Sequence, residues 1–228
     1  MRRVVENLEG EYGPKRNSRS RDALDELVLT ILSQQNSSAS TREVFAELKR
    51  RFPTWDAANA APAAAIEDAI RSGGLARMKA ARIKSLLAAI REERGSFDLS
   101  FLKRMPADEA LAYLTRFKGV GPKTARCTLL FTFGTAVFPM DVHIFRILER
   151  LGLLDPRWTD ERAHREAAAL VPNGKHYSAH VNLIEHGRKV CRPTSPRCDA
   201  CCLIDYCPEG HERLAARDED DPRLGRRV

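Results

Sequence analysis

The sequence has no apolar run near the roughly 18 residues that a transmembrane helix needs. After Arg2 and Arg3 come Glu6, Asn7 and Glu9 in place of the apolar core of a signal peptide. Glycine and proline are few, 13 and 12 of 228 residues, which excludes collagen-like and low-complexity chains. We therefore expect a cytoplasmic protein, in a compartment where thiols stay reduced.

The length of 228 residues suits one domain or two small interlocked ones, and 43% hydrophobic residues suffice for a core. Lysine and arginine exceed aspartate and glutamate by 38 to 31, a net charge of +7. A basic balance of this size favours a polyanionic partner such as a nucleic acid.

Strand-like alternation is missing, since no stretch sustains a period of two residues. Helical spacing recurs instead: Leu24, Leu27, Val28, Ile31 and Leu32 lie on one face of a helix. Further helices are expected to start near residues 40, 62, 106, 122, 142, 160 and 178, with another over residues 83–90. The first twenty residues and residues 217–228 are polar and charged, and we expect both to be loosely ordered. The sequence predicts an all-α protein.

A first candidate site is the tight turn between two helices at residues 119–123. Gly119 and Gly121 flank a valine, and Pro122 suits the first position of the helix that follows. Such a turn lets another molecule approach the backbone, and the free N–H groups of the helix start favour a phosphate. Lys123 lies in the first turn, where the helix dipole disfavours its ammonium form and so suits a neutral nucleophile. An ordinary helical corner with a lysine that contacts phosphate is the alternative.

The second candidate is Asp141, 18 positions beyond Lys123 and just before another apolar helix stripe. It can cap that helix, act as a carboxylate opposite the nucleophile, or do both. His143 and Arg146 are expected to face solvent or the DNA backbone.

Five of the six cysteines fall within residues 191–207. Four of them, Cys191, Cys198, Cys201 and Cys207, have a spacing that predicts a closed metal site of four thiolates. The spacing leaves zinc and a [4Fe–4S] cluster open, with disulfides as a further alternative. Cys202 is expected to be a spare thiol and Cys127 a core residue. Arg192 and Arg197 make the first loop a basic finger that could contact phosphates.

Together these segments resemble the endonuclease III family of helix-hairpin-helix DNA glycosylases. The hairpin at residues 119–125, the segment at 141–146 and the cysteine loop occur in the family's order and at its spacing. The resemblance runs from about residue 22 to residue 207, most of the chain.

The resemblance implies a two-lobed all-α fold with double-stranded DNA bound in the cleft between the lobes. One lobe, residues 22–135, is a six-helix bundle with the helix-hairpin-helix. The other joins residues 1–21 to 136–228 and carries a [4Fe–4S] cluster. The expected partner is DNA with damaged bases or abasic sites, bound by a monomer that would be associated with the nucleoid if the protein is bacterial.

The same resemblance implies the role of each site residue. Lys123 matches the nucleophilic lysine and Asp141 the catalytic aspartate. Gln35 matches a residue that fills the gap left by an extruded nucleotide, and Leu75 a wedge that intrudes on the opposite strand. The positions that match the phosphate-binding turn and the cluster ligands are Gly119, Gly121, Cys191, Cys198, Cys201 and Cys207.

The implied function is base-excision repair by a bifunctional glycosylase and abasic-site lyase. It would remove an oxidised base, with a pyrimidine expected, through a lysine Schiff base, and nick the strand by β-elimination. Three alternatives stay open: a glycosylase for oxidised guanine or a mismatch, a non-catalytic or weakly active DNA-binding protein of the same fold, and a helix-turn-helix regulator with a metal-sensing cysteine loop.

Overall fold

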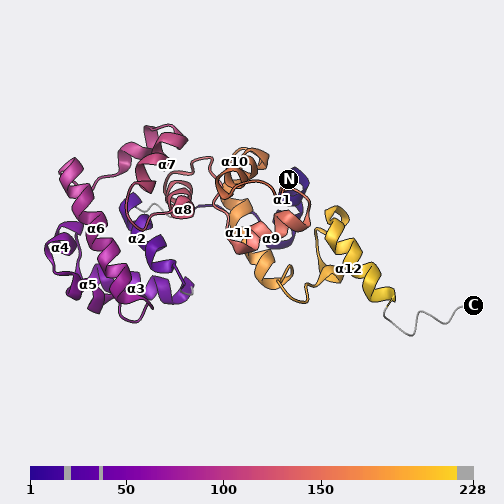
Figure 1. Ribbon diagram of the computed structural model, residues 1–228, viewed down its shortest axis with the longest axis horizontal. Helices are drawn as coiled ribbons and strands as arrows, with labels where there is room; N and C mark the ends of the chain where they lie inside the picture. Colours follow the sequence, from indigo (N-terminus) through magenta and orange to yellow (C-terminus); the bar gives the residue numbers. More distant parts are fainter. Residues whose placement is uncertain (18–21, 36–37, 220–228) are drawn as a thin grey trace, which may run out of the picture. The chain divides into compact units, whose positions relative to one another are not determined.

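The computed structural model describes residues 1–17, 22–35 and 38–219, and these are helical with connecting turns (Figure 1). None of these residues forms a strand, so the predicted all-α class is confirmed. Within the same ranges, no helix is both long enough and apolar enough to cross a membrane. The chain divides into two compact units, Arg19–Thr135 and Met1–Ser18 with Ala136–Val228.

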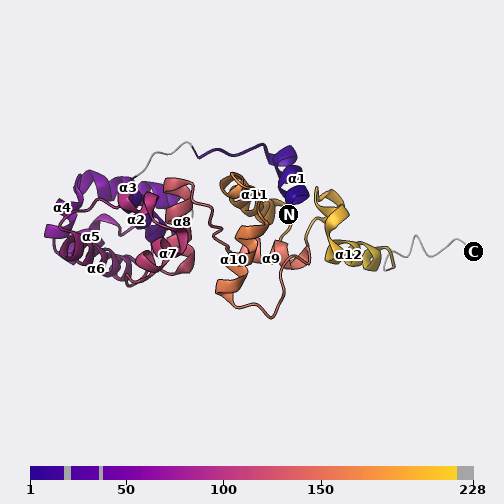
Figure 2. The ribbon, with the colours of Figure 1, turned by 90° about the horizontal axis from the view of Figure 1, so that it is seen from above.

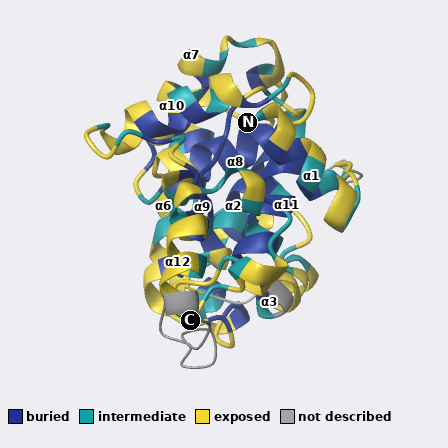
Figure 3. Ribbon diagram, turned by 90° about the vertical axis from the view of Figure 1, so that its right-hand side faces the viewer, coloured by how far each residue is buried: buried dark blue, intermediate teal, exposed yellow. Residues whose placement is uncertain are grey.

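The unit Arg19–Thr135 is built around α2, which packs against α3, α6 and α8. Its apolar stripe is buried as the sequence predicts, and Asp22 Oδ1 caps it by accepting hydrogen bonds from the N–H groups of Leu24 and Asp25. Burial along these helices is shown in Figure 3. The helices of this unit are α2 (Ala23–Ser33), α3 (Ser38–Arg51), α4 (Trp55–Ala60), α5 (Ala63–Ala69), α6 (Ala76–Arg94), the 3₁₀ helix η1 (Ser100–Arg104), α7 (Ala107–Thr115) and α8 (Pro122–Phe133).

The second unit packs α11 against α1 and α9, with α12 beside α9 and the cysteine loop. Its core is formed by apolar side chains of α1, α9, α10 and α11, with Phe138 and Leu203 between them. The helices are α1 (Arg2–Tyr12), α9 (Val142–Arg150), α10 (Asp160–Leu170), α11 (His176–Lys189), η2 (Cys198–Ala200), η3 (Ile204–Tyr206) and α12 (Pro208–Glu219).

The expectation of a loosely ordered N-terminus is wrong for residues 2–12, which form α1 beside α11 (Figure 2). Val4, Val5 and Leu8 are buried against the core of the second unit. Because only these three apolar residues supply the buried face, the charged remainder hides the helical pattern in the sequence. At the other end α12 continues to Glu219, and residues 220–228 lie outside the described residues.

Candidate functional site

The turn between α7 and α8 has the geometry of a helix-hairpin-helix. Gly119 has a φ of 90°, which favours glycine, and a Cβ there would lie 2.7 Å from Cδ of Arg82, so that side chain would have to shift. Gly121 is the N-cap of α8 and offers no side chain to the helix start. Pro122 takes the first helical position, and Lys123 follows it with an exposed side chain. This helix start presents N–H groups and an accessible amine to a ligand.

Gln35 and Leu75 have a backbone feature in common. Apart from glycines, the residues with positive φ in the described part of the chain are Gln35 at 59°, Leu75 at 54° and Ser195 at 49°. A left-handed conformation at a residue with a Cβ costs of order 1–3 kcal/mol, and such residues persist where the surroundings enforce them. Leu75 also leaves 46% of its surface exposed. Both side chains therefore stand out from the fold at a cost in stability, which suits residues that contact a partner.

We predict that Leu75→Gly separates stability from DNA engagement. Glycine adopts the left-handed conformation freely, so the free energy of unfolding should stay within about 1 kcal/mol of the wild-type value. Leu75→Ala keeps the strained backbone and should be less stable than Leu75→Gly. Both variants should bind a duplex with an abasic analogue more weakly to a similar extent. Chemical denaturation and fluorescence anisotropy measure the two quantities, and wild-type affinity in both variants would contradict a wedge role.

Asp141 is the N-cap of α9, and the cap uses one of its two carboxylate oxygens. Oδ1 accepts the N–H groups of His143 and Ile144, each at 2.9 Å. Among the described residues no hydrogen bond is made by Oδ2, and the next residue, Val142, is 74% exposed. The capping and catalytic interpretations are therefore compatible, since the second oxygen stays available for a ligand.

Arg146 differs from the expectation that it faces solvent or DNA. Its Nη2 donates to the carbonyl oxygens of Gly187 at 3.0 Å and Cys191 at 2.7 Å, and it lies 3.1 Å from Nδ1 of His143. His143 packs so closely on α11 that a Cβ at Gly187 would lie 2.7 Å from its own Cβ. The carbonyls at the end of α11 attract the guanidinium inward, so Arg146 joins α9 to the cysteine loop. His143 is half-buried beside it, and its predicted DNA contact stays a prediction.

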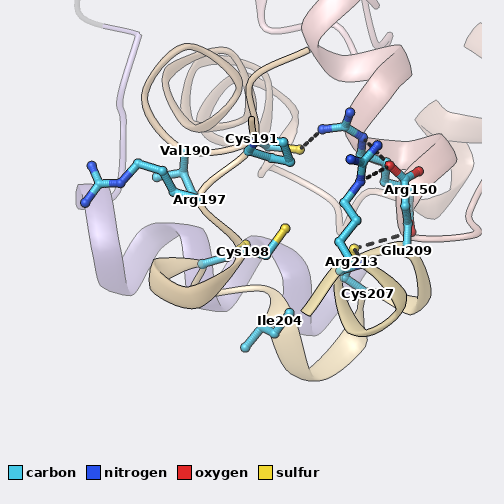
Figure 4. Close-up of a pocket in the computed structure, with 12 residues that line it drawn as sticks. Arg150, Val190, Cys191, Arg197, Cys198, Ile204, Cys207, Glu209 and Arg213 are labelled. Carbon is cyan, nitrogen blue, oxygen red and sulfur yellow. Dashed lines mark hydrogen bonds and ion pairs between the residues drawn. The ribbon is translucent and has the colours of Figure 1, made fainter. Parts of the chain in front are cut away.

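The four predicted thiol ligands line one pocket (Figure 4). Cys191, Cys198, Cys201 and Cys207 reach it from the loop between α11 and α12. Burial raises the pKa of Cys201 to about 12 and also raises those of Cys198 and Cys207. Thiols of this kind bind a metal as thiolates, and a bound metal would compensate for the burial of their negative charge.

Two pocket residues carry a positive charge that the sequence did not reveal. Arg150, whose side chain is only 10% exposed, donates from Nη1 to Sγ of Cys191 at 3.3 Å and pairs with Glu209. Arg213 pairs with the same carboxylate. The only sequence signal of Arg150 is its place at the end of an apolar helix stripe, where an arginine is common. Arg213 lies in the middle of the polar helix α12 and has no such signal.

A buried histidine also contacts the thiol group. His186 lies 3.0 Å from Oη of Tyr12 through Nδ1 and 3.5 Å from Sγ of Cys201 through Nε2. Burial lowers its pKa to about 4, so the ring is neutral at pH 7. Tyr12 comes from α1, the helix that the sequence left unassigned, so the signal for this contact was missed with it.

The donor set of the pocket fits a group that thiolates bind. Among residues 1–17, 22–35 and 38–219, no three His, Cys, Asp or Glu side chains are already placed around one point as they would be around a bound metal ion. Four thiolates can hold a zinc ion or a [4Fe–4S] cluster, so the donor set fits both occupants.

The pocket is also lined by Arg197 but not by Arg192 or by the two other cysteines. Both arginines are exposed, and Figure 4 shows the guanidinium of Arg197 directed away from the sulfur atoms. Cys127 is buried within α8, and Cys202 is not among the residues that line the pocket.

The comparisons with known proteins agree with this geometry. Residues 28–173 match the model of the HhH-GPD superfamily of base excision DNA repair proteins. An Arabidopsis thaliana protein named as a DNA glycosylase is 37% identical over 74% of this chain, which spans only 57% of that relative. Endonuclease III of Sulfolobus acidocaldarius is 33% identical over 83% of both chains. A solved structure titled as a trapped endonuclease III–DNA covalent intermediate matches 93% of this chain and 96% of its own with a TM-score of 0.78 and 26% identity.

The helix-hairpin-helix turn, the family match over residues 28–173 and the likeness to endonuclease III over 83% of both chains lead to one assignment. The expected family and its base-excision repair function are confirmed. The chain belongs to the HhH-GPD superfamily of base excision DNA repair proteins and is of the endonuclease III type.

Proposed function

We propose that this protein is a bifunctional DNA glycosylase and abasic-site lyase that acts as a monomer on oxidised bases, pyrimidines first, in double-stranded DNA. The observation that supports it most directly is the exposed amine of Lys123 in the first turn of α8, immediately after the Gly119–Gly121 turn. A hydrolytic glycosylase has no need of a nucleophile there, whereas a lyase needs an amine. The trapped covalent intermediate of the structural relative supports the same chemistry.

In the proposed reaction Nζ of Lys123 forms a bond to C1′ of the damaged nucleotide while the bond from C1′ to the base breaks. The base leaves with the bonding electrons and takes up a proton. Oδ2 of Asp141, the oxygen left over from the helix cap, stabilises the positive charge that develops on the sugar and accepts a proton from the amine. The bond from C1′ to the ring oxygen O4′ then breaks as the amine nitrogen forms a double bond to C1′, and O4′ takes up a proton. The resulting Schiff base acidifies C2′, and loss of that proton expels the 3′ phosphate.

DNA binding is assigned to the hairpin and to the two strained residues. The N–H groups at the start of α8 and the backbone of Gly119 bind a phosphate. Gln35 and Leu75 occupy the space left when the damaged nucleotide leaves the stack, an extrusion that costs a few kcal/mol and least for a damaged base. His143, Arg192 and Arg197 add contacts to the backbone, which makes binding weaken as salt rises.

The pocket thiols Cys191, Cys198, Cys201 and Cys207 would hold a [4Fe–4S] cluster, which supplies a rigid cross-link and one-electron chemistry when bound. The chain's own part is the pocket: Arg150 offsets thiolate charge, and the neutral ring of His186 hydrogen-bonds the sulfur of Cys201. Through Arg146 the same loop is tied to α9, the helix that Asp141 caps. The proposed role of the cysteine loop and its cluster is therefore to support the start of α9, where Asp141 lies.

We predict that Cys201→Ser loses the cluster and Cys202→Ser keeps it. The two cysteines are adjacent, but only Cys201 lines the pocket. The wild-type protein and Cys202→Ser should be brown, absorb near about 400 nm and contain about four irons per chain. Cys201→Ser should be depleted of iron. Stoichiometric zinc in a colourless wild-type protein, purified from cells supplied with iron, would contradict the assignment.

The proposal is tested by reduction of the protein–DNA adduct with borohydride. Duplexes carry an oxidised pyrimidine, oxidised guanine, a mismatch or a preformed abasic site, and the covalent band is quantified for each. The proposal expects a band with the oxidised pyrimidine and with the abasic site. Base release without a band would show a hydrolytic glycosylase, and binding without either product would show a non-catalytic DNA-binding protein.

Oxidised guanine is the second candidate substrate. The residue after Asp141 is valine, and an Asp-Val-His segment resembles that of superfamily glycosylases for oxidised guanine. Because Val142 is 74% exposed beside the proposed catalytic oxygen, it is placed to contact a substrate. A stronger band with oxidised guanine than with the oxidised pyrimidine would favour this candidate.

A further inference from the structure

Lys79 on α6 is fully buried, with an exposed fraction of 0%. Its Nζ donates to the carbonyl oxygens of Leu32 at 2.8 Å and Gly73 at 3.0 Å. No carboxylate forms an ion pair with it among the residues that the structure describes, and burial lowers its pKa. A lysine is rarely buried unless its hydrogen bonds compensate for the lost hydration. The two carbonyl bonds are therefore the reason for its position.

The two carbonyls belong to the segments that carry Gln35 and Leu75. Leu32 is in the last turn of α2, three residues before Gln35, and Gly73 is two residues before Leu75. The last carbonyls of a helix form the negative end of its dipole, which attracts a cation. The ammonium of Lys79 donates to such a carbonyl at Leu32 and, with the same group, to the carbonyl of Gly73 in the second segment.

Arg82 extends this arrangement on the same face of α6, since residues three apart on a helix are neighbours. Its Nη1 donates to Oε1 of Gln34 at 2.8 Å, next to Gln35. Its Cδ lies where a Cβ at Gly119 would be 2.7 Å away, so it packs on the hairpin turn. One face of α6 thus contacts three segments that lie far apart in the sequence.

We propose that Lys79 and Arg82 are positioning residues. They hold the Gln35 segment, the Leu75 segment and the hairpin turn in fixed positions relative to one another, so that Gln35 and Leu75 enter the DNA together. This inference rests on the proposed function. Strained left-handed residues persist only where surrounding contacts enforce them, and Gln35 and Leu75 both lie within three residues of a carbonyl held by Lys79. Without these bonds the Gln35 segment and the Leu75 segment would change conformation independently, and each would contact the duplex in a different orientation.

The test compares Lys79→Met with Lys84→Met. Lys84 is a lysine of the same helix whose Nζ also donates to a carbonyl, that of Asn59, but this carbonyl is remote in sequence from both segments. The first probe is a duplex with an abasic analogue beside 2-aminopurine, whose fluorescence reports unstacking. The second is an oligonucleotide with a true abasic site, used single-stranded and as a duplex, for borohydride trapping.

Lys79→Met is expected to lower the unstacking signal and to slow trapping on the duplex by about tenfold to a hundredfold, the range for a misplaced contact. Trapping on the single strand, which has no opposite strand to enter, should change by less than twofold. Lys84→Met should retain both activities. Equal slowing on duplex and single strand, or an unchanged duplex rate in folded Lys79→Met, would overturn the inference.

Two further measurements keep the inference testable if Lys79→Met does not fold. Arg82→Met removes the bond to Gln34 and should reproduce the selective loss on duplex, with rescue by Arg82→Lys only in part. In a Leu75→Ala background, Arg82→Met should slow trapping on the duplex by a smaller factor than in the wild-type background. The effects of substitutions that act through the same wedge residue are not additive. Full additivity would contradict the inference. A wild-type protein that unstacks the probe but traps neither substrate would refute the proposed lyase and leave the positioning test intact.

Discussion

Lys123→Gln is expected to lose borohydride trapping and strand nicking by at least about 10³-fold while it still binds duplex DNA. Glutamine keeps the helix propensity and most of the length of lysine but has no nucleophilic amine. Because Lys123 is exposed in the first turn of α8, the substitution leaves no buried group without a partner. The free energy of unfolding should therefore change by less than about 0.5 kcal/mol.

The matched control is Lys118→Gln, which removes an equal charge from another exposed residue of the same turn. Both variants should bind DNA slightly more weakly and with a shallower salt dependence, because each loses one potential phosphate contact. Only Lys123→Gln should lose the covalent band. Undiminished nicking by Lys123→Gln would place the nucleophile elsewhere, and equal losses in both variants would reduce Lys123 to a phosphate contact.

The sequence predicted those elements whose apolar residues recur at helical spacing in one segment. The α2 stripe is such a case, since each of its apolar positions is buried. The hairpin was predictable because its signals are local: Gly119 adopts a positive φ, which favours glycine, and Pro122 takes the first position of the helix that follows. Signals of this kind lie in neighbouring residues and can be detected without a partner segment.

Contacts between distant segments had no such signal. In the sequence Lys79 looks like one more charged residue of a basic helix. It is fully buried because carbonyl oxygens 47 and 6 residues away accept hydrogen bonds from its ammonium group. Arg150 is held by a thiol and by Glu209 beyond the cysteine loop. The α1 helix was missed because its few apolar residues become meaningful only when α11 covers them. These features depend on tertiary packing that sequence patterns do not encode locally.

Asp141 shows how two interpretations of one residue can both hold. The sequence left a helix cap and a catalytic carboxylate as alternatives. In the structure the cap takes Oδ1 alone, with two N–H donors at 2.9 Å. A carboxylate has a second oxygen with its own lone pairs, so the same side chain can fix the start of α9 and present a charge to a substrate.

Because one oxygen of Asp141 caps the helix and the other is available to a substrate, we predict that Asp141→Asn and Asp141→Ala differ in stability and have similarly low activity. Asparagine caps a helix about as well as aspartate, so Asp141→Asn should change the free energy of unfolding by less than about 1 kcal/mol. Alanine accepts neither N–H group, so Asp141→Ala should cost about 1 kcal/mol more. Both substitutions remove the carboxylate that holds charge and accepts a proton, so base release should fall about 10² to 10⁴-fold in each.

Chemical denaturation gives the two free energies, and single-turnover base release on a substrate identified by the lesion panel gives the rates. Thr159→Ala is the control, because Thr159 caps α10 and the substitution removes a cap without touching the proposed chemistry. It should cost a similar free energy to Asp141→Ala and leave the rate of base release near the wild-type value. If Asp141→Asn released the base at the wild-type rate, Asp141 would be a helix cap alone, and the positive charge at the sugar would need another group to stabilise it.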